Sequence, residues 1–364
     1  MPNDVKPNAA RVTHAELIRF IAAAYRAVGI PEADAAKAAE LMAASDISGA
    51  DGHGVFRLPQ YIRRIKAGGL NTRPEITVIR QARAAAIVDG DNGLGSLVVS
   101  RAVEEAIALA RDNGVGWVGT RNGNHAGAAA VYAAMPVAHD MIGLYFAVGN
   151  ANHLPPWGGV DMLLSTNPIA VAVPAFEEPP LILDMATTVA AYGKVKVAAQ
   201  QGKTMPEGWM IDRQGQPLTD PNRADDGFLL PIGGYKGAAL ALMFGLLAGT
   251  LNGAANGADV VDFNKDDTTP TNTGQAICVL DIKAFAEPLA FKRQIDAVIR
   301  QLQGSALLPG FDHIRLPRRG PPPPHRGAPR QRHPDPAGIA RRPRQARRRS
   351  THPAALRVSG DGKS

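Results

Sequence analysis

Residues 86–120 read AIVDGDNGLGSLVVSRAVEEAIALARDNGVGWVGT, and this stretch decides the fold class. Two short apolar runs, 86–89 and 116–120, enclose a segment, 94–113, with a helical pattern. Alternation of strand-like runs with helical patterns is typical of α/β layer structures. The turn contains Gly-x-Gly, but Val98 fills the third glycine position, so the dinucleotide fingerprint of the usual Rossmann fold is absent.

The same alternation extends from about residue 76 to residue 303. The sequence predicts strands at 76–79, 86–89, 116–120, 142–148, 169–173, 181–184 and 276–281. It predicts helices at 94–113, 128–139, 186–200, 235–251 and 288–303. These elements indicate one extended α/β unit.

The first 70 residues have a different pattern and predict a small helical unit. Thr13 and Glu16 have the spacing of a capping box, so we expect a helix that runs to about Gly29. A second helix is expected from Pro31, because proline is favoured at the first helical position. The third, 56–66, is followed by two glycines that suit a helix end.

The composition indicates a globular protein of one large or two modest domains, with 364 residues, 45% of them hydrophobic and 20% charged. Cys278 is the only cysteine, which excludes an intramolecular disulfide and a cysteine-rich zinc site. The N-terminus lacks a signal-peptide pattern, and the most apolar run, 237–254, has four glycines and is short for a membrane span. We therefore expect a soluble cytoplasmic protein without a membrane partner.

The net charge of +7 is unevenly distributed. Residues 318–364 hold 12 Arg, one Lys and two Asp, a net charge of +11, whereas the 27 basic and 31 acidic residues upstream give −4. Rich in proline and poor in periodic apolar residues, this Arg/Pro-rich tail is expected to be disordered. Two interpretations are open: a nucleic-acid-binding arm, or the product of a shifted reading frame in a GC-rich gene.

A histidine between glycines begins the first candidate site, Gly52-His53-Gly54-Val55-Phe56-Arg57. If a helix begins at Gly54, His53 lies at its start and Arg57 in its first turn. Histidine exchanges protons near neutral pH, and arginine holds a carboxylate through two parallel hydrogen bonds, so the pair suits an acidic substrate. Ordinary surface positions are the alternative for both residues.

His125 follows the predicted strand 116–120 in the segment Asn122-Gly123-Asn124-His125. Ligands bind at the carboxyl ends of strands in α/β sheets, so His125 is a candidate site residue. The alternative is a loop histidine satisfied by backbone groups. A metal triad of His53, His125 and Asp184 would need compact ligand spacing, which is absent, so no metal is expected.

Three further segments lie at strand ends or at a helix start. Residues 150–168 contain Pro155-Pro156-Trp157-Gly158-Gly159 and Ser165-Thr166-Asn167-Pro168, which indicate tight turns around a ligand or in a surface loop. Asp184-Met185-Ala186 follows another strand. Gly233-Gly234-Tyr235-Lys236-Gly237 begins a helix whose backbone N–H groups, with Lys236, suit a phosphate or pyrophosphate.

In composition, order and separation these segments resemble the malate/L-lactate dehydrogenase family of the non-Rossmann type. Its members include ureidoglycolate dehydrogenase, sulfolactate dehydrogenase, 2,3-diketogulonate reductase and Δ1-piperideine-2-carboxylate reductase. The resemblance runs from about Thr13 to Pro317. It implies a mixed-sheet NAD(P)-binding domain of non-Rossmann topology, a helical domain, and a homodimer with the active site near its interface. The implied boundaries are 1–75, joined by about 285–317, for the helical domain, 76–284 for the cofactor-binding and catalytic domain, and 318–364 for the tail.

The resemblance also implies an activity: hydride transfer between NAD or NADP and a small 2-hydroxy or 2-oxo acid, or a cyclic imino acid. His53 and His125 fall on the family's acid/base positions, and Arg57 on the position that grips the substrate carboxylate. Thr166 and Asn167 would line the site. The positions similar to cofactor contacts are Asn150, Asp184, Met185, Ala186 and Lys236. The reaction needs a base for the hydroxyl proton and a cation for the carboxylate, and the residues supply candidates for both.

The chain departs from the family pattern twice. Gly52 stands where the family usually has serine, a hydroxyl that helps to orient His53. After Arg315-Leu316-Pro317, the family's glycine and cofactor-contacting acidic residue are replaced by Arg318-Arg319-Gly320. The abrupt change favours the shifted-frame interpretation and predicts weakened cofactor binding and activity.

Two other functions stay open from the sequence. One is a nucleic-acid-binding protein that acts through the basic tail and carries an inactive enzyme-like body. The tail lacks aromatic residues among its basic ones, which argues against specific single-strand recognition. The other is a metal-dependent hydrolase that uses the histidines.

Overall fold

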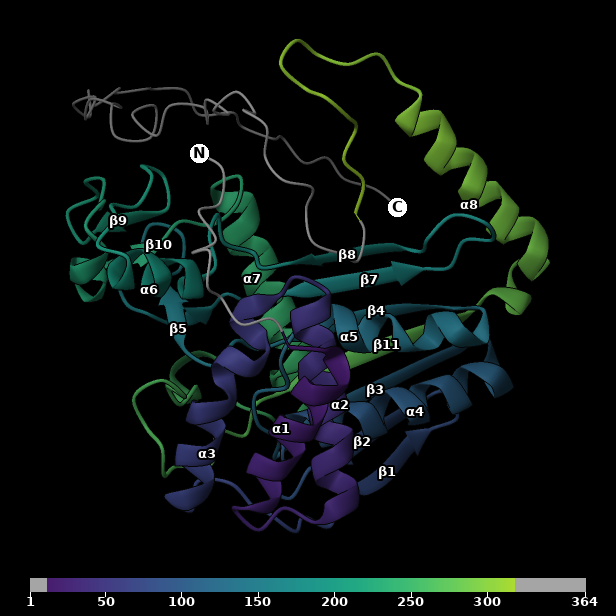
Figure 1. Ribbon diagram of the computed structural model, residues 1–364, viewed down its shortest axis with the longest axis horizontal. Helices are drawn as coiled ribbons and strands as arrows, with labels where there is room; N and C mark the ends of the chain where they lie inside the picture. The colour runs from purple at the N-terminus through teal and green to yellow at the C-terminus, as the bar shows by residue number, and fades with distance from the viewer. Residues whose placement is uncertain (1–11, 318–364) are drawn as a thin grey trace, which may run out of the picture. The chain divides into compact units, whose positions relative to one another are not determined.

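A computed structural model describes residues 12–317 of the chain (Figure 1). The expectation of a disordered tail at 318–364 concerns residues outside this range. The centre of the described part is a mixed seven-stranded sheet with the order β1-β2-β3-β11-β4-β7-β8. Only β2 and β3 are parallel neighbours in it, and the other adjacent pairs are antiparallel. The mixed sheet confirms the predicted fold class.

All seven strands of this sheet lie where the sequence predicts them, within three residues at each end. Their bounds are β1 Thr77–Ala82, β2 Ala85–Asp89, β3 Val115–Arg121, β4 Met141–Ala147, β7 Ile169–Val173, β8 Leu181–Met185 and β11 Gln275–Asp281.

Glycines on the inner strands let helices approach the sheet closely. Gly116 of β3 and Gly143 of β4 both lie opposite Val279 of β11. A Cβ at Gly116 would collide with the backbone of α4 (Gly95–Asn113), and one at Gly143 with the backbone of α5 (Ala129–Ala133). These two helices cover one face of the sheet (Figure 1). The predicted helix 128–139 divides into α5 and the 3-10 helix η3 (Met135–His139), which contains Pro136.

The opposite face packs against α7 (Tyr235–Ala248), which forms much of the apolar run 237–254. The helix buries its small residues Gly237, Ala241 and Gly245, whereas large apolar side chains such as Met243, 52% exposed, face outward. No helix in residues 12–317 is long and apolar enough to cross a membrane.

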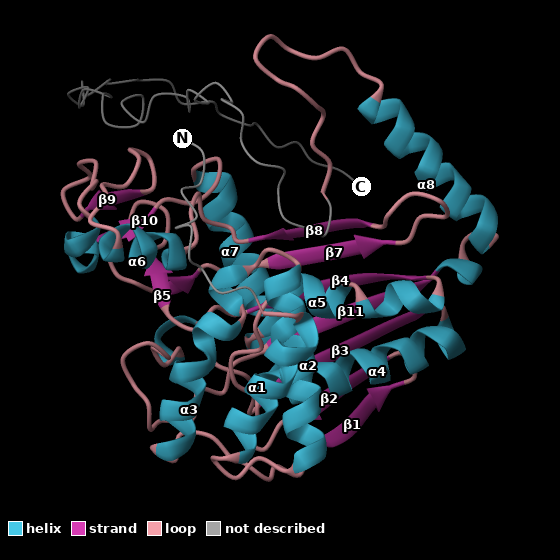
Figure 2. Ribbon diagram, viewed as in Figure 1, coloured by secondary structure: helices cyan, strands magenta, loops and turns pink. Residues whose placement is uncertain are grey.

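The N-terminal helical unit forms as predicted, with α1 His14–Arg26, α2 Glu32–Ile47 and α3 Leu58–Lys66 (Figure 2). The Thr13–Glu16 capping box is present, and both of its reciprocal hydrogen bonds form. The core of this unit includes Leu94 and Phe263 from the following α/β part, so the two parts share one apolar cluster.

A small lobe carries its own apolar cluster beside the sheet. It contains α6 Tyr192–Gln200 and the short strands β5 Asn152–Leu154, β6 Leu164–Ser165, β9 Met210–Asp212 and β10 Gly227–Leu229. The predicted start of the helix at residue 186 is wrong, because 187–189 are β-branched and make other backbone contacts. Thr187 Oγ1 donates to the carbonyl oxygen of Thr166, and Val189 N–H donates to that of Leu230.

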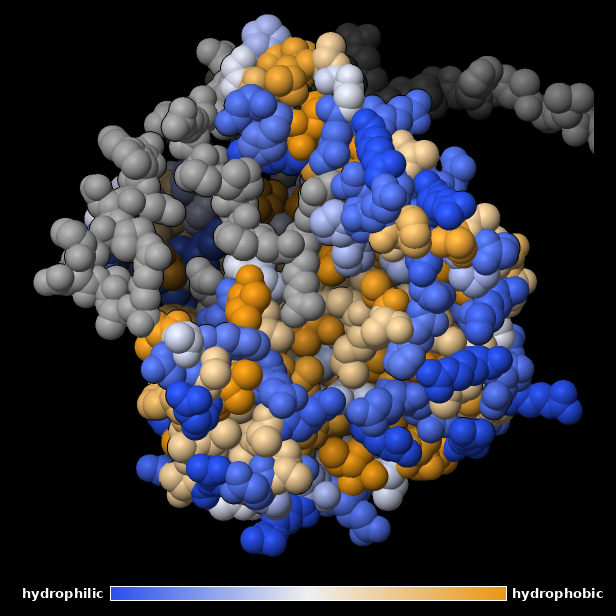
Figure 3. Space-filling view, turned by 45° about the vertical axis from the view of Figure 1, so that its right-hand side comes forward, coloured by the Kyte–Doolittle hydropathy of each residue, from blue (hydrophilic) through white to orange (hydrophobic). Residues whose placement is uncertain are grey.

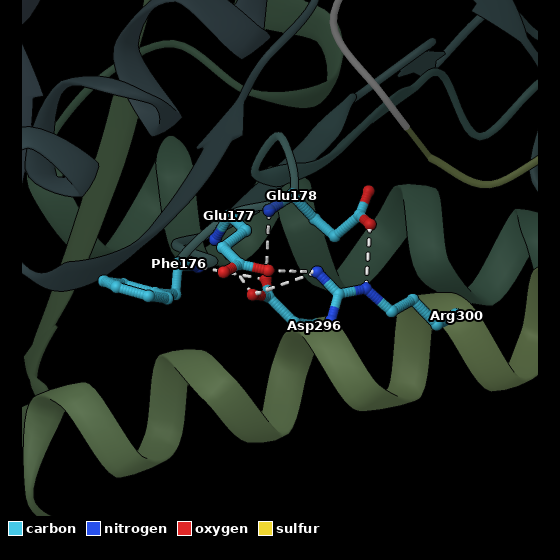
Figure 4. A network of polar contacts seen from close by, with 5 residues as sticks. All are labelled: Phe176, Glu177, Glu178, Asp296 and Arg300. Carbon is cyan, nitrogen blue, oxygen red and sulfur yellow. Dashed lines mark hydrogen bonds and ion pairs between the residues drawn. The ribbon is translucent and has the colours of Figure 1, made fainter.

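The last helix, α8 (Pro288–Gln303), lies at the sheet edge away from α1–α3 (Figure 1). Asp296 accepts hydrogen bonds from the backbone N–H groups of residues 176–178, and Arg300 pairs with Glu177 and Glu178 (Figure 4). The residues after α8 project from the body, with hydrophobic side chains at the tip (Figure 3). The union of 285–317 with 1–75 in one domain stays a prediction.

Candidate active site

The described part contains a cavity of about 1150 Å³ where the helical unit meets the carboxyl ends of β3, β4 and β8. Small-molecule sites usually enclose about 300–1000 Å³, so this one has room for a dinucleotide together with a small acid. Eight of the ten predicted site residues line it: His53, Arg57, His125, Asn150, Thr166, Asp184, Met185 and Ala186.

The other two predicted residues do not line this cavity. Asn167 is fully buried, where its side chain accepts from Gly149 N–H at 3.0 Å and donates to Ala241 O at 2.7 Å. It thus supports the turn next to Asn150 instead of facing a ligand. Lys236 is exposed in the first turn of α7, because this helix turns its small-residue face inward. The single chain does not bring Lys236 to the cavity.

His125 is held by aromatic neighbours on several sides. The Tyr61 hydroxyl hydrogen-bonds Nδ1 of the imidazole and donates to the backbone oxygen of His125 at 3.1 Å. The Phe263 ring stacks on the imidazole with 5.2 Å between centroids, and the His53 ring with 5.8 Å. Because Tyr61 engages Nδ1, Nε2 is the nitrogen left for a substrate.

Both histidines are neutral at pH 7. Burial, and secondarily the charge of Arg57, lowers the pKa of His53 to about 4. The same two causes, with His53 added, hold the pKa of His125 well below its ordinary value. A neutral imidazole at neutral pH accepts a proton, as a base for hydroxyl oxidation must.

The His53 segment is built differently from the prediction that a helix begins at Gly54. Two 3-10 turns, η1 Asp51–His53 and η2 Val55–Arg57, precede α3. The Asp46 carboxylate accepts from Val55 N–H at 2.9 Å and lies where a Cβ at Gly54 would be, so a side chain at residue 54 would have to displace this carboxylate. Gly52 is different: a Cβ there would meet nothing within 4 Å, so the family's serine would fit.

Arg57 reaches the cavity from the end of η2. Its Nε donates to Gly52 O at 2.9 Å, and its Nη1 donates to Gln60 Oε1 at 3.0 Å and to Asn264 Oδ1 at 3.3 Å. Burial lowers the pKa of Arg57, yet a guanidinium stays charged at neutral pH. Within the described residues these bonds use Nε and Nη1, which leaves Nη2 for a carboxylate.

A buried arginine ties α3 to the loop that carries Phe263 and Asn264. Arg64 is 0% exposed, and its guanidinium donates to the backbone oxygens of Asp266, Thr269 and Gly69. It also lies over the Phe263 ring, 5.4 Å from the centroid. This loop therefore keeps a fixed place beside Arg57 and His125.

Replacing Asn124 by alanine is expected to destabilise the protein by about 2–4 kcal/mol, because the loop before His125 loses its buried anchor. The Asn124 side chain, 0% exposed, donates to Asn92 and Gly93 and accepts from Thr271 Oγ1 at 3.1 Å. Urea unfolding measures the change. An Asn222→Ala variant, at an exposed position, is the control, and equal stability of the two variants would contradict the prediction.

The part of the cavity wall formed by α6 fits phosphate groups. The first turn of α6 lines it through residues 191–194, and no side chain caps this helix start. Backbone N–H groups and the positive end of a helix dipole bind anions, and Lys194 of this turn also lines the cavity. Lys203 is a further lining residue, but it lies just after the last turn of α6, where its N–H donates to Ala198 O. Nearby, burial raises the pKa of Asp184, whose carboxylate accepts from Ala130 N–H at 2.9 Å. The start of α6 and Lys194 fit the pyrophosphate of a dinucleotide.

Several cavity residues were not among those predicted from the sequence: His153, Lys194, Lys203, Phe263 and Asn264. Tyr61, which hydrogen-bonds His125 from behind the cavity wall, was not predicted either. Tyr61 had a usable signal, because it lies four residues after Arg57 in a predicted helix and so on the same face. Phe263 and Asn264 lie in a loop without periodicity. In residues 12–317 no group of three or more His, Cys, Asp or Glu side chains is arranged to hold a metal.

The cavity lies at strand ends of an α/β sheet and contains two neutral histidines, a guanidinium and an uncapped helix start. This combination is typical of an enzyme that acts on small acids with a phosphate-bearing cofactor. The profile of the malate/L-lactate dehydrogenase family matches residues 12–320. The chain belongs to this family.

One relative is similar to this chain along most of its length. Malate dehydrogenase of Pyrococcus horikoshii is 38% identical over 323 residues, with 85% of this chain and 87% of that protein covered. Its solved structure superimposes with a TM-score of 0.77 at 35% identity, covering 85% of this chain and 87% of that one.

Two other relatives differ in the cofactor that their names specify. The NAD(+) ureidoglycolate dehydrogenase of Escherichia coli K12 is 32% identical, over 79% of this chain and 82% of its own. The NADP(+) (2R)-3-sulfolactate dehydrogenase of Chromohalobacter salexigens is 33% identical, over 81% of this chain and 88% of its own. The chain is thus an NAD(P)-dependent oxidoreductase that acts on the CH–OH group of 2-hydroxy acids.

Proposed function

We propose that the protein interconverts a small 2-hydroxy acid of the malate or lactate kind with its 2-oxo acid, or reduces a cyclic imino acid, with His125 as the proton-exchanging group. The observation that carries this proposal is the neutral, tightly held imidazole of His125 in the same cavity as the Arg57 guanidinium. His53, whose ring stacks on His125, is the alternative proton carrier.

In the proposed oxidation, Arg57 binds the substrate carboxylate and orients the carbinol carbon. Nε2 of His125 accepts the hydroxyl proton, while Tyr61 holds the imidazole through Nδ1. When bound, NAD(P) supplies the hydride acceptor for oxidation and the hydride donor for reduction. In reduction, the same histidine returns its proton to the oxygen.

Other residues of the cavity wall are proposed to contact the cofactor. They are Asn150, Asp184, Met185 and Ala186, with Thr166 nearer the substrate, and the uncapped start of α6 supports a pyrophosphate contact. Leu316 and Pro317 also line the cavity, so the departure from the family pattern begins at its wall. This proximity supports the prediction of weakened cofactor binding. Resequencing the DNA around codon 318 tests the shifted frame, and an intact frame would contradict it.

Nicotinamide fluorescence of the purified protein tests the function. We expect NADH or NADPH to bind with altered fluorescence, followed by turnover with at least one of malate, lactate, sulfolactate, ureidoglycolate or a cyclic imino acid. Neither binding nor turnover across this panel would contradict the proposal. The family match ends at residue 320, and nothing in the described residues favours the nucleic-acid alternative.

The pH dependence of oxidation should reflect the depressed histidine pKa. The base must be neutral, and its pKa lies below the ordinary value, so the acid limb of kcat/KM should shift to lower pH. We expect kcat/KM for lactate to decline, as the pH is lowered, only well below the ordinary histidine pKa of about 6.5. An acid limb centred at about pH 6.5 or higher would contradict this prediction.

We also propose a cytoplasmic homodimer that packs through α7. This helix exposes Leu240, Leu242, Met243 and Leu246 while it buries glycine and alanine, the reverse of a helix that faces solvent. Light scattering after gel filtration should report a dimer, and Met243→Glu should shift it towards the monomer. A wild-type monomer would contradict the proposal.

A further inference from the structure

We propose that a second, smaller cavity next to the main one holds one water molecule, and that this water and the Tyr61 hydroxyl carry a proton between His125 and His53. The inference rests on the proposed function, because it concerns the route by which the proton taken from the substrate leaves His125. It adds an internal water site and gives each of the two histidines its own role.

The second cavity has a volume of about 10 Å³, and residues of α1, α2, α3 and α4 supply most of its wall. This volume is at the lower limit for one water molecule, which needs about 10–15 Å³. None of the lining residues is exposed. The polar side chains of the wall belong to Tyr25, His53, Tyr61 and Ser96. A buried water makes about three hydrogen bonds, so these four groups are enough to hold one.

The Tyr25 hydroxyl provides the strongest evidence for a water. Tyr25 is 1% exposed, yet its hydroxyl makes no hydrogen bond to any of residues 12–317. Buried hydroxyl groups almost always have a partner, which is either protein or ordered water. Burial, and secondarily the nearby Tyr61, holds the pKa of Tyr25 well above its ordinary value, so this phenol keeps its proton at neutral pH and can donate it. A water in the second cavity would satisfy it.

The Tyr61 hydroxyl links His125 to the second cavity. Its oxygen contacts both Nδ1 and the backbone oxygen of His125, and Ala126, the next residue in the chain, lines the second cavity. A hydroxyl has one donor and two acceptor sites, and its proton can rotate. Tyr61 can therefore accept the Nδ1 proton while it turns its own proton from the His125 carbonyl towards a water. Burial raises the pKa of Tyr61, so that proton is present at neutral pH.

The two imidazoles do not face each other in a way that permits direct proton transfer. Their rings are stacked, with 14° between the planes and 5.8 Å between the centroids. The N–H bonds lie in the ring planes, so neither ring points a nitrogen at the other. His53 lines both cavities, and it can therefore meet the water on one side and the main cavity on the other.

The proposed route moves one proton at each step and changes no oxidation state. Nε2 of His125 accepts the hydroxyl proton of the substrate, and Nδ1 gives its own proton to the Tyr61 oxygen. The Tyr61 hydroxyl proton passes to the water, and a proton of the water passes to His53. His125 is then neutral again, with its proton on Nε2, while the product still occupies the main cavity. Burial and the charge of Arg57 disfavour a charged His53, so the proton moves on to the main cavity.

The test follows hydride transfer and proton release in one turnover of malate or lactate oxidation, by the absorbance of NADH or NADPH and by a pH-indicator dye in weak buffer. In the wild type we expect equal rates for the two signals. Tyr25→Phe and Ser96→Ala each remove one hydroxyl from the second cavity. Each should slow proton release by about 10-fold relative to hydride transfer, with KM within about two-fold, because the water loses a hydrogen bond.

Ser100→Ala is the matched control for Ser96→Ala. Ser100 lies one turn further along α4, and its hydroxyl donates to Glu104 at 3.4 Å instead of lining the second cavity. Its proton release should stay equal to hydride transfer. Unchanged proton release in both cavity variants, or an equal slowing of both signals, would overturn the inference and leave the dehydrogenase function standing. The melting temperatures of the variants report whether each is folded.

A crystal structure of the wild type tests the water site without turnover. We expect one water at about 2.7–3.2 Å from the Tyr61 oxygen and from a nitrogen of His53, with the Tyr25 hydroxyl as a third partner. An empty second cavity, or a direct hydrogen bond between Tyr25 and Tyr61 in its place, would overturn the inference. If no acid is turned over, the proposed function fails, and this crystal structure decides the inference by itself.

Discussion

His125→Ala is expected to lower kcat for 2-hydroxy-acid oxidation by about 1000-fold, within the usual range for the loss of a general base. The imidazole is neutral, its Nδ1 is bound by the Tyr61 hydroxyl, and it shares the cavity with Arg57. Among the described residues, the other imidazole of the cavity, that of His53, has a ring contact but no hydrogen bond that fixes it in this way. Steady-state turnover at saturating substrate and cofactor measures the loss.

The matched variants separate the two histidines. His53→Ala should lower kcat less than His125→Ala, because the His53 ring stacks on the other ring and no side-chain hydrogen bond to residues 12–317 holds it. His139→Ala, at an exposed position, should leave turnover unchanged. A greater loss in His53→Ala would transfer the proton-exchanging role to His53, and unchanged turnover in both site variants would refute the assignment altogether.

Arg57→Met is expected to reduce kcat/KM by about 100- to 1000-fold, mainly through KM, because the substrate carboxylate loses its cation in a partly buried site. Arg57→Lys should recover only part of the loss, since an ammonium cannot form the two parallel hydrogen bonds of a guanidinium. Initial-rate kinetics over a wide substrate range would measure both variants.

The control for this experiment lies on the adjacent helix. Arg63 is exposed on α3 and its nearest ion-pair partner is Asp267 at 3.5 Å, so Arg63→Met removes one charge without a cavity contact. We expect kcat/KM to stay within about two-fold of the wild type in this variant. Equal losses in Arg57→Met and Arg63→Met would mean that net charge, not a carboxylate contact, governs substrate binding.

The strands of the main sheet could be predicted because their apolar runs are buried and bounded by turn residues. The start of α6 could not, since 187–189 follow Asp184 in an apolar pattern that reads equally as helix. Their contacts with residues 166 and 230 decide the conformation, and these lie far away in the sequence. Helix propensity depends on neighbouring residues, so it cannot take such distant partners into account.

Some residues of the candidate site could be predicted from the sequence and others could not. His53, Arg57 and His125 stand out because each lies at a strand end or a helix start in a segment that contains glycines. Asn264 lies 207 positions after Arg57 along the chain and belongs to no motif. Only the folded chain brings the two together, so their contact could not be inferred from spacing. Lys236 is the opposite case, because it belongs to a sequence motif but lies outside the cavity of the single chain.

The place of β11 in the sheet has a consequence for synthesis of the protein. Residues 275–281 fill the position between β3 and β4, strands that are made more than 100 residues earlier. Until the ribosome has released this segment, β3 and β4 each present an unpaired inner edge, a template for aggregation. The sheet of the nascent chain therefore cannot close until β11, the last strand in the described residues, has been synthesised. A reading-frame change after Pro317 comes late enough to spare that closure, whereas an interruption before Gln275 would leave both edges open.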